Sequence, residues 1–266
     1  MVTGLLLFII AFISGAYGII VGAGGGFIFV PVLLIFFNMS PSIAAGTGLV
    51  VVMLNSISGA IGYVKQKRID YKQGLLISAG AAPGTFIGVW LGQYSSPQIF
   101  YVTFSIVTLL LGFFLLLKKD SGQIKSTAKG EVAVTLEEET TEVGKSKYYK
   151  VYSLLLVGVI LGSISSYLGI GGGWLLVPIL IYLFRVSPHY ATATSIYSLC
   201  IYSTIGVITQ IYHNNIDWVV VLWGGLGVIV GAQAGVFLSN KISGNLIIKL
   251  LSLLLIGTGV QLFISK

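Results

Sequence analysis

Two glycine runs contain the residues of this chain that are best suited to bind a ligand. The first glycine run is residues 22–26 (Gly-Ala-Gly-Gly-Gly), and the second glycine run is residues 169–173 (Gly-Ile-Gly-Gly-Gly). Each run interrupts an apolar stretch and is followed by a Val-Pro pair. Glycine lets backbone N–H groups approach a ligand without an intervening Cβ atom. The N–H groups that open a helix are unpaired and lie at the positive end of its dipole, so this pattern favours an anion.

Close helix packing is the alternative interpretation of the same glycines, because small residues line helix interfaces in membranes. The chain contains 35 glycines, so a scattered glycine says little, whereas a tripled glycine at matching positions says more. We therefore expect the tripled glycines to form an anion cradle. These residues are Gly24, Gly25, Gly26, Gly171, Gly172 and Gly173.

The spacing of 147 residues between the two runs continues along the chain without a gap. Ten of the twenty positions in residues 22–41 are identical to their partners in residues 169–188, and Thr47 matches Thr194. The chain is therefore a duplicated unit. In transporters, a binding site is often indicated by glycines that interrupt an apolar stretch at the same position in each half.

The composition predicts an all-α, polytopic membrane protein. The chain is 56% hydrophobic and 9% charged, whereas soluble domains carry charge on about a quarter of their residues. The period-two alternation of a membrane β-barrel is absent. The net charge of +7 lies mostly in loops that flank apolar segments, so it does not indicate nucleic-acid binding.

Each half contains five apolar segments, of which the second is short. A segment of about 12 residues gives roughly 18 Å of helix, too little to cross about 30 Å of hydrocarbon, so we expect a half-helix that begins near the membrane midplane. The expected segments are 3–21, 26–37, 43–64, 73–92, 98–117, 148–168, 173–185, 190–211, 218–238 and 246–264. We assign residues 1–117 to the first membrane repeat, 118–149 to a charged cytoplasmic linker and 150–266 to the second repeat.

Charge predicts opposite orientations for the two repeats. Lys65, Lys67, Arg68 and Lys72 surround the turn between the third and fourth segments, whereas the equivalent turn at 213–217 has no Lys or Arg. Because basic loops stay in the cytoplasm, we expect an inverted-topology repeat with both termini outside.

Chemistry other than anion transport finds little support in the sequence. None of the eight acidic residues lies inside an apolar segment, so an intramembrane carboxylate relay is not visible and a bound cation would lack a counter-charge. One cysteine and two isolated histidines suggest neither a disulfide within the chain nor a metal site. We expect no catalytic site, no cofactor and no enzyme activity.

Polar residues within the helical segments are candidate partners of the anion. Back-bonding to the helix and bonding between helices are the alternatives for each hydroxyl. Cysteine and methionine are also ordinary core residues, although a polarizable sulfur at residue 200 would suit a sulfur-containing substrate. The selected residues are Thr47, Thr194, Ser56, Ser203, Cys200 and Gln233.

The repeated G-x-G-G-G-x-x-x-x-P motif at 22–31 and 169–178, with Ser-Pro pairs at 40–41 and 187–188, resembles the TauE/SafE family of sulfite and sulfonate exporters. The resemblance covers both repeats and leaves out the charged linker. It implies transport of small sulfur oxyanions, such as sulfite or organosulfonates, across the bacterial inner membrane. The expected partners are thus a small anionic substrate and the lipid bilayer. A permease for thiosulfate, sulfate or a carboxylate, or a non-transporting scaffold, remains an alternative, and transport direction, energy coupling and oligomeric state stay open.

Overall fold

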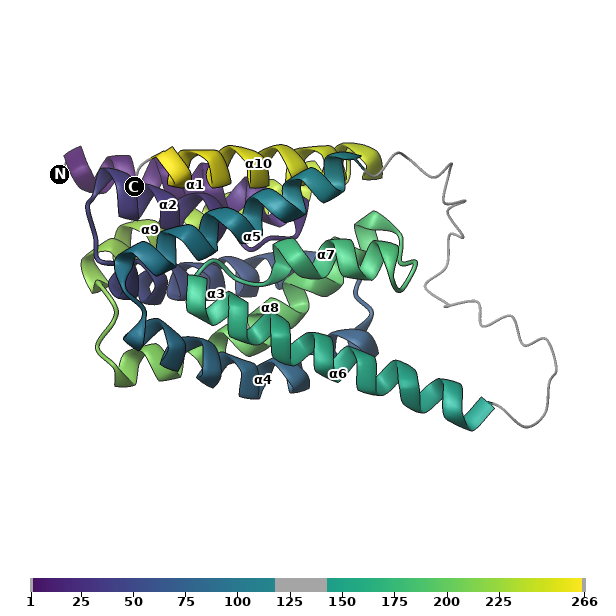
Figure 1. The fold of residues 1–266 in the computed structure, drawn as a ribbon. Helices are drawn as coiled ribbons and strands as arrows, with labels where there is room; N and C mark the ends of the chain where they lie inside the picture. The colour runs from purple at the N-terminus through teal and green to yellow at the C-terminus, as the bar shows by residue number, and fades with distance from the viewer. Residues whose placement is uncertain (1, 118–142, 265–266) are drawn as a thin grey trace.

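The computed structural model describes residues 2–117 and 143–264, and within these ranges every regular element is a helix (Figure 1). This confirms the predicted all-α class. Eight helices are long and apolar enough to cross a membrane, and α2 and α7 are shorter. The helices are α1 (Val2–Val21), α2 (Gly26–Phe36), α3 (Pro41–Lys65), α4 (Tyr71–Tyr94), α5 (Pro97–Leu117), α6 (Val143–Leu168), α7 (Gly173–Tyr182), α8 (Pro188–Tyr212), α9 (Trp218–Ser239) and α10 (Gly244–Ile264).

The helix bounds follow the same 147-residue spacing as the sequence. Both bounds of α3 and α8 match at this spacing, and so do both bounds of α5 and α10. The helix α6 begins at Val143, inside the residues that we assigned to the linker, and the rest of that predicted linker, residues 118–142, lies outside the described residues.

Helix starts are fixed by the same residue types in both halves. Proline occupies the first position of α3 and of α8, where its missing N–H costs nothing because that group has no helical acceptor. Aspartate caps the fourth helix of each half. The Oδ1 atom of Asp70 accepts from the Gln73 N–H, and that of Asp217 accepts from the N–H groups of Val219 and Val220, at 3.0–3.1 Å.

The first helix of each half packs against the fourth helix of the other half. A stripe of glycines on each fourth helix allows these pairs, α1 with α9 and α4 with α6, to approach closely. A Cβ atom added to any glycine of the stripe would lie 2.1–2.4 Å from a carbonyl oxygen of the facing helix. The stripes consist of Gly80, Gly84 and Gly88 on α4 and of Gly227, Gly231 and Gly235 on α9.

The contacts also fix the directions of the helices. The carbonyl oxygens of Phe8, Phe12 and Ala16 face the three α9 glycines in the same order along both helices, so α1 and α9 run in the same direction. The Asp217 N–H, just before α9, donates to Thr47 Oγ1 in the first two turns of α3, so α3 also starts at this end.

Each short helix runs back toward the end of the bundle where the preceding long helix starts. The helix α1 starts at the end where α3 begins, and α2 finishes five residues before α3, so α1 and α2 form a re-entrant hairpin. By the same contacts α6 runs along α4, and Thr194 of α8 joins the turn before α4, so α6 and α7 form a second hairpin from the opposite end. The first residues of α1 and the last residues of α10 lie at one end of the bundle (Figure 1).

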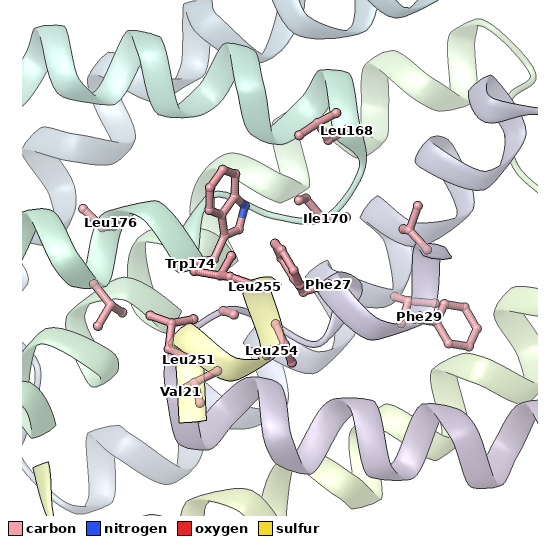
Figure 2. Packing of buried hydrophobic residues seen from close by; sticks show 14 of the residues in the cluster. Val21, Phe27, Phe29, Leu168, Ile170, Trp174, Leu176, Leu251, Leu254 and Leu255 are labelled. Carbon is pink, nitrogen blue, oxygen red and sulfur yellow. The ribbon is translucent and has the colours of Figure 1, made fainter. Parts of the chain in front are cut away.

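The buried core is centred where α2 and α7 begin. Phe27 and Trp174 occupy matching positions in the two halves, and their rings pack at an interplanar angle of 59° with centroids 5.6 Å apart (Figure 2). Both side chains are almost wholly buried, and leucines of α10 lie beside them. This packing holds the two helix starts, and with them the glycine runs, in contact.

Candidate functional site

The structure brings the two glycine runs into direct contact. A Cβ atom added to Gly173 would lie 2.0 Å from the Gly22 carbonyl oxygen, and one added to Gly26 would lie 3.0 Å from Ile170. The side chains of Val52 and Leu199, which occupy matching positions on α3 and α8, both reach the runs. The runs thus form one continuous structure at the interface of the halves.

Two different constraints require glycine in these runs. Gly22, Gly24, Gly25, Gly169 and Gly171 have φ values between 68° and 84°, a region that residues with a Cβ atom rarely adopt. At the other tripled glycines, the shortage of space is the constraint. These constraints support the interpretation that the glycines allow close packing. The anion cradle stays a prediction.

Unpaired backbone donors remain at both helix starts. In the first run the Gly24 N–H donates to the Gly18 carbonyl oxygen, whereas the N–H groups of Gly25, Gly26 and Phe27 have no acceptor among the described residues. In the second run the N–H groups of Gly173 and Trp174 are likewise free within the described ranges. These groups offer the positive end of two short helices to a ligand.

Two buried side chains of α3 face the first run. Asn55 and Ser56 are completely buried, and the Asn55 amide atoms and Ser56 Oγ have no hydrogen-bond partner among the described residues. Asn55 Nδ2 lies 3.0 Å from the Cβ position of Gly25, and Ser56 Oγ lies 3.5 Å from that of Gly24. A buried polar group without a partner costs about 1–3 kcal/mol, so this pair calls for an explanation.

Ser56 was selected from the sequence and Asn55 was not. The available signal for Asn55 was an amide in the middle of an apolar segment, where polar side chains are costly and tend to be functional. A second omission is Ser195 of α8, whose buried hydroxyl donates to the Gly22 carbonyl oxygen at 2.9 Å. This bond joins the second half directly to the first glycine run.

The matched threonines and Ser203 form hydrogen bonds away from the unpaired donors. Thr47 Oγ1 accepts from the Asp217 N–H, and Thr194 Oγ1 accepts from the Asp70 N–H, both at 3.0 Å. These matched bonds join each third helix to the turn before the fourth helix of the other half. Ser203 Oγ donates to the Leu199 carbonyl oxygen of its own helix.

Cys200 and Gln233 lie outside the immediate contact of the glycine runs. Cys200 is half-buried on α8. The Gln233 side-chain amide donates to the carbonyl oxygen and to Oγ of Ser58 at 2.7 and 2.9 Å, so it joins α9 to α3. Among the described residues, no group of three or more His, Cys, Asp or Glu could hold a metal ion.

A family profile described as "Sulfite exporter TauE/SafE" matches residues 7–262, which includes both halves. The chain belongs to the TauE/SafE family. It is 29% identical to the "Probable membrane transporter protein YunE" of Bacillus subtilis over 264 residues, which cover 97% of this chain and 96% of the relative. It is 28% identical to the "Probable membrane transporter protein MJ0441" of Methanocaldococcus jannaschii over 253 residues, which cover 90% and 87% of the two chains. No solved structure matches the chain.

Membership of the TauE/SafE family confirms the resemblance seen in the repeated motif. With the eight apolar helices, it identifies a multi-pass membrane protein of a transporter family. The names of these relatives state transport and no substrate. The choice of substrate therefore depends on the chemistry of the site.

Proposed function

We propose that the protein is a secondary transporter that exports small sulfur oxyanions, such as sulfite or organosulfonates. The anion binds near the membrane midplane, against the glycine runs. The observation that carries this proposal is the set of unpaired N–H groups at the starts of α2 and α7, with the unpartnered side chains of Asn55 and Ser56 beside the first run. The family description supplies the sulfur chemistry.

The charge distribution supports an anion over a cation. The described acidic residues of the membrane region, Asp70 and Asp217, cap helices at the two ends of the bundle. A cation among the glycine runs would therefore meet no carboxylate, whereas an anion would meet helix dipoles and N–H donors. An oxyanion has several acceptor oxygens and can use donors from more than one side.

We further propose that the two halves are inverted repeats that rock against one another to alternate access to the anion. The opposite directions of the two re-entrant hairpins and the matched Asp-Thr bonds support this arrangement. In the described part of the chain, the turns on the side of Asp70 carry Lys67, Arg68, Arg185 and Lys241, and the turns on the side of Asp217 carry no Lys or Arg. The positive-inside rule then places the Asp70 side in the bacterial cytoplasm and both termini outside.

Flux into liposomes tests the substrate. Purified protein should carry sulfite or methanesulfonate at least about tenfold faster than protein-free liposomes, a difference equivalent to about 1.4 kcal/mol in barrier. Thiosulfate, sulfate and acetate form the comparison panel. If none of the five anions entered faster than into protein-free liposomes, the transport proposal would be refuted. A clearly faster flux of acetate or sulfate would identify a different substrate.

Thiol labelling tests the orientation of the repeats. In a Cys200→Ser background, Lys72→Cys and Val219→Cys place one thiol in the first turn of α4 and of α9, at exposed positions. A membrane-impermeant maleimide should label Val219→Cys in intact cells, and Lys72→Cys only after permeabilisation. Equal labelling of both variants in intact cells would contradict the inverted orientation.

A further inference from the structure

The two halves differ at one matched position beside the glycine runs. Tyr202 of α8 corresponds to Asn55 of α3, and its buried hydroxyl accepts the Gly172 N–H at 2.9 Å. Asn55 has no such bond to Gly25, the glycine that corresponds to Gly172, and both atoms of its amide are unpartnered. Among the described residues, Tyr202 therefore pairs the Gly172 N–H of the second run and leaves those of Gly173 and Trp174 free, whereas Asn55 leaves the matching Gly25 N–H of the first run without a partner.

The next position shows the same difference. Ser203 donates to the carbonyl oxygen of Leu199 in its own helix, whereas the matching Ser56 has no partner among the described residues. The backbone differs as well, because Gly25 has φ 78° and Gly172 has φ −89°. Three independent features thus distinguish the first run from the second at corresponding positions.

We propose that a single anion binds on the first half only, and that it is a monoanion with one protonated oxygen, as in hydrogensulfite. This inference rests on the proposed function and sharpens it. The N–H groups of Gly26 and Phe27, with Asn55 Nδ2 and Ser56 Oγ, donate to the anion. Asn55 Oδ1 accepts the hydrogen of its protonated oxygen.

The surroundings of Asn55 account for the preference for a single charge. Gly15 of α1 and Gly25, the N-cap residue of α2, lie beside the Asn55 amide, and neither of them titrates. Transfer of a second negative charge into this buried site would have no cation to offset the loss of hydration. The asparagine amide also presents an acceptor oxygen beside its NH2 group, so a fully deprotonated oxyanion bound across both would leave Oδ1 facing a negative oxygen.

Flux of sulfite into liposomes at two pH values tests the charge state. Sulfite flux should rise severalfold as the pH falls through the range in which hydrogensulfite forms. The flux of methanesulfonate, a monoanion without a protonated oxygen at either pH, should stay constant and below that of sulfite at the lower pH. Sulfate should be carried at least tenfold more slowly than sulfite at the lower pH. Sulfite flux that increases with pH, or sulfate flux equal to sulfite flux, would overturn the proposal that the bound anion carries a single charge.

Matched variants test the location of the site. Asn55→Leu and Ser56→Ala should each reduce sulfite flux at least tenfold, whereas Ser203→Ala should change it less than twofold. Asn55→Leu should also raise the thermal unfolding temperature, because it removes an unpartnered buried amide, whereas a purely structural Asn55 would give a lower temperature. Ser56→Ala adds no atom to the core, so its folded state is secure.

The outcomes separate this inference from the proposed function. A wild-type protein that carries no sulfur oxyanion refutes both. A wild-type protein that carries sulfite, with unchanged flux in Asn55→Leu and Ser56→Ala, refutes only the site on the first half. A loss in Ser203→Ala equal to that in Ser56→Ala would show that both halves contribute equivalent hydroxyls and would overturn the one-sided site.

Discussion

Gly173→Ala is expected to abolish transport and to lower the stability of the folded protein. The added methyl group would lie 2.0 Å from the Gly22 carbonyl oxygen, 2.7 Å from Leu199 and 2.9 Å from Ser195 Oγ. The first of these atoms belongs to the backbone, so a side-chain rotation cannot relieve the clash and the two runs must separate. Overpacking of this kind costs about 1–3 kcal/mol or more. Liposome flux of sulfite and thermal unfolding in detergent measure the two effects.

Gly257→Ala is the matched control for this substitution. Gly257 lies in α10, and a Cβ atom there would have no neighbour within 4 Å. Alanine is favoured over glycine inside a helix by about 1 kcal/mol, so this variant should keep its flux and unfold at an equal or higher temperature. If Gly173→Ala behaved like Gly257→Ala, the close contact of the glycine runs would not matter for folding or transport.

The helices of this protein could be predicted from the sequence because each depends on local pattern. The predicted segment 26–37 is α2 (Gly26–Phe36), and a proline and an aspartate mark where α3 and α4 begin. The choice of helix partners depends on the full fold. Gly84 and Gly231 look like ordinary glycines in the sequence, and only the packed structure shows that each faces the backbone of a helix from the other half.

The site could be predicted in outline for the same reason. The tripled glycines are visible as a repeated pattern, whereas Ser56 and Ser203 are the same residue type at matched positions and cannot be ranked from the sequence. Their difference arises because one hydroxyl bonds to its own helix and the other faces the first glycine run. Asn55 and Tyr202 differ in type, but the meaning of that difference depends on which glycine each one faces.

Gly84→Ala and Gly231→Ala are expected to destabilise the protein strongly and by similar amounts. A methyl group at Gly84 would lie 2.2 Å from the Val159 carbonyl oxygen, and one at Gly231 would lie 2.2 Å from that of Phe12. These four residues are equivalent under the 147-residue spacing, so the same helix separation is needed in each pair. We expect a loss of about 1–3 kcal/mol or more in the free energy of unfolding for each variant, measured by chemical or thermal denaturation in detergent.

Gly92→Ala gives the contrast within the same helix. Gly92 continues the four-residue spacing of Gly80, Gly84 and Gly88 on α4, but a Cβ atom there would lie 3.9 Å from its nearest neighbours, an ordinary contact distance. This variant should therefore be neutral or slightly stabilising, although its sequence context resembles that of Gly84. A loss at Gly92 equal to that at Gly84 would mean that helix separation does not explain the effect. A loss at Gly84 without one at Gly231 would mean that the two helix pairs are energetically different, and the two hairpins could then not act as equivalent parts of a rocking transporter.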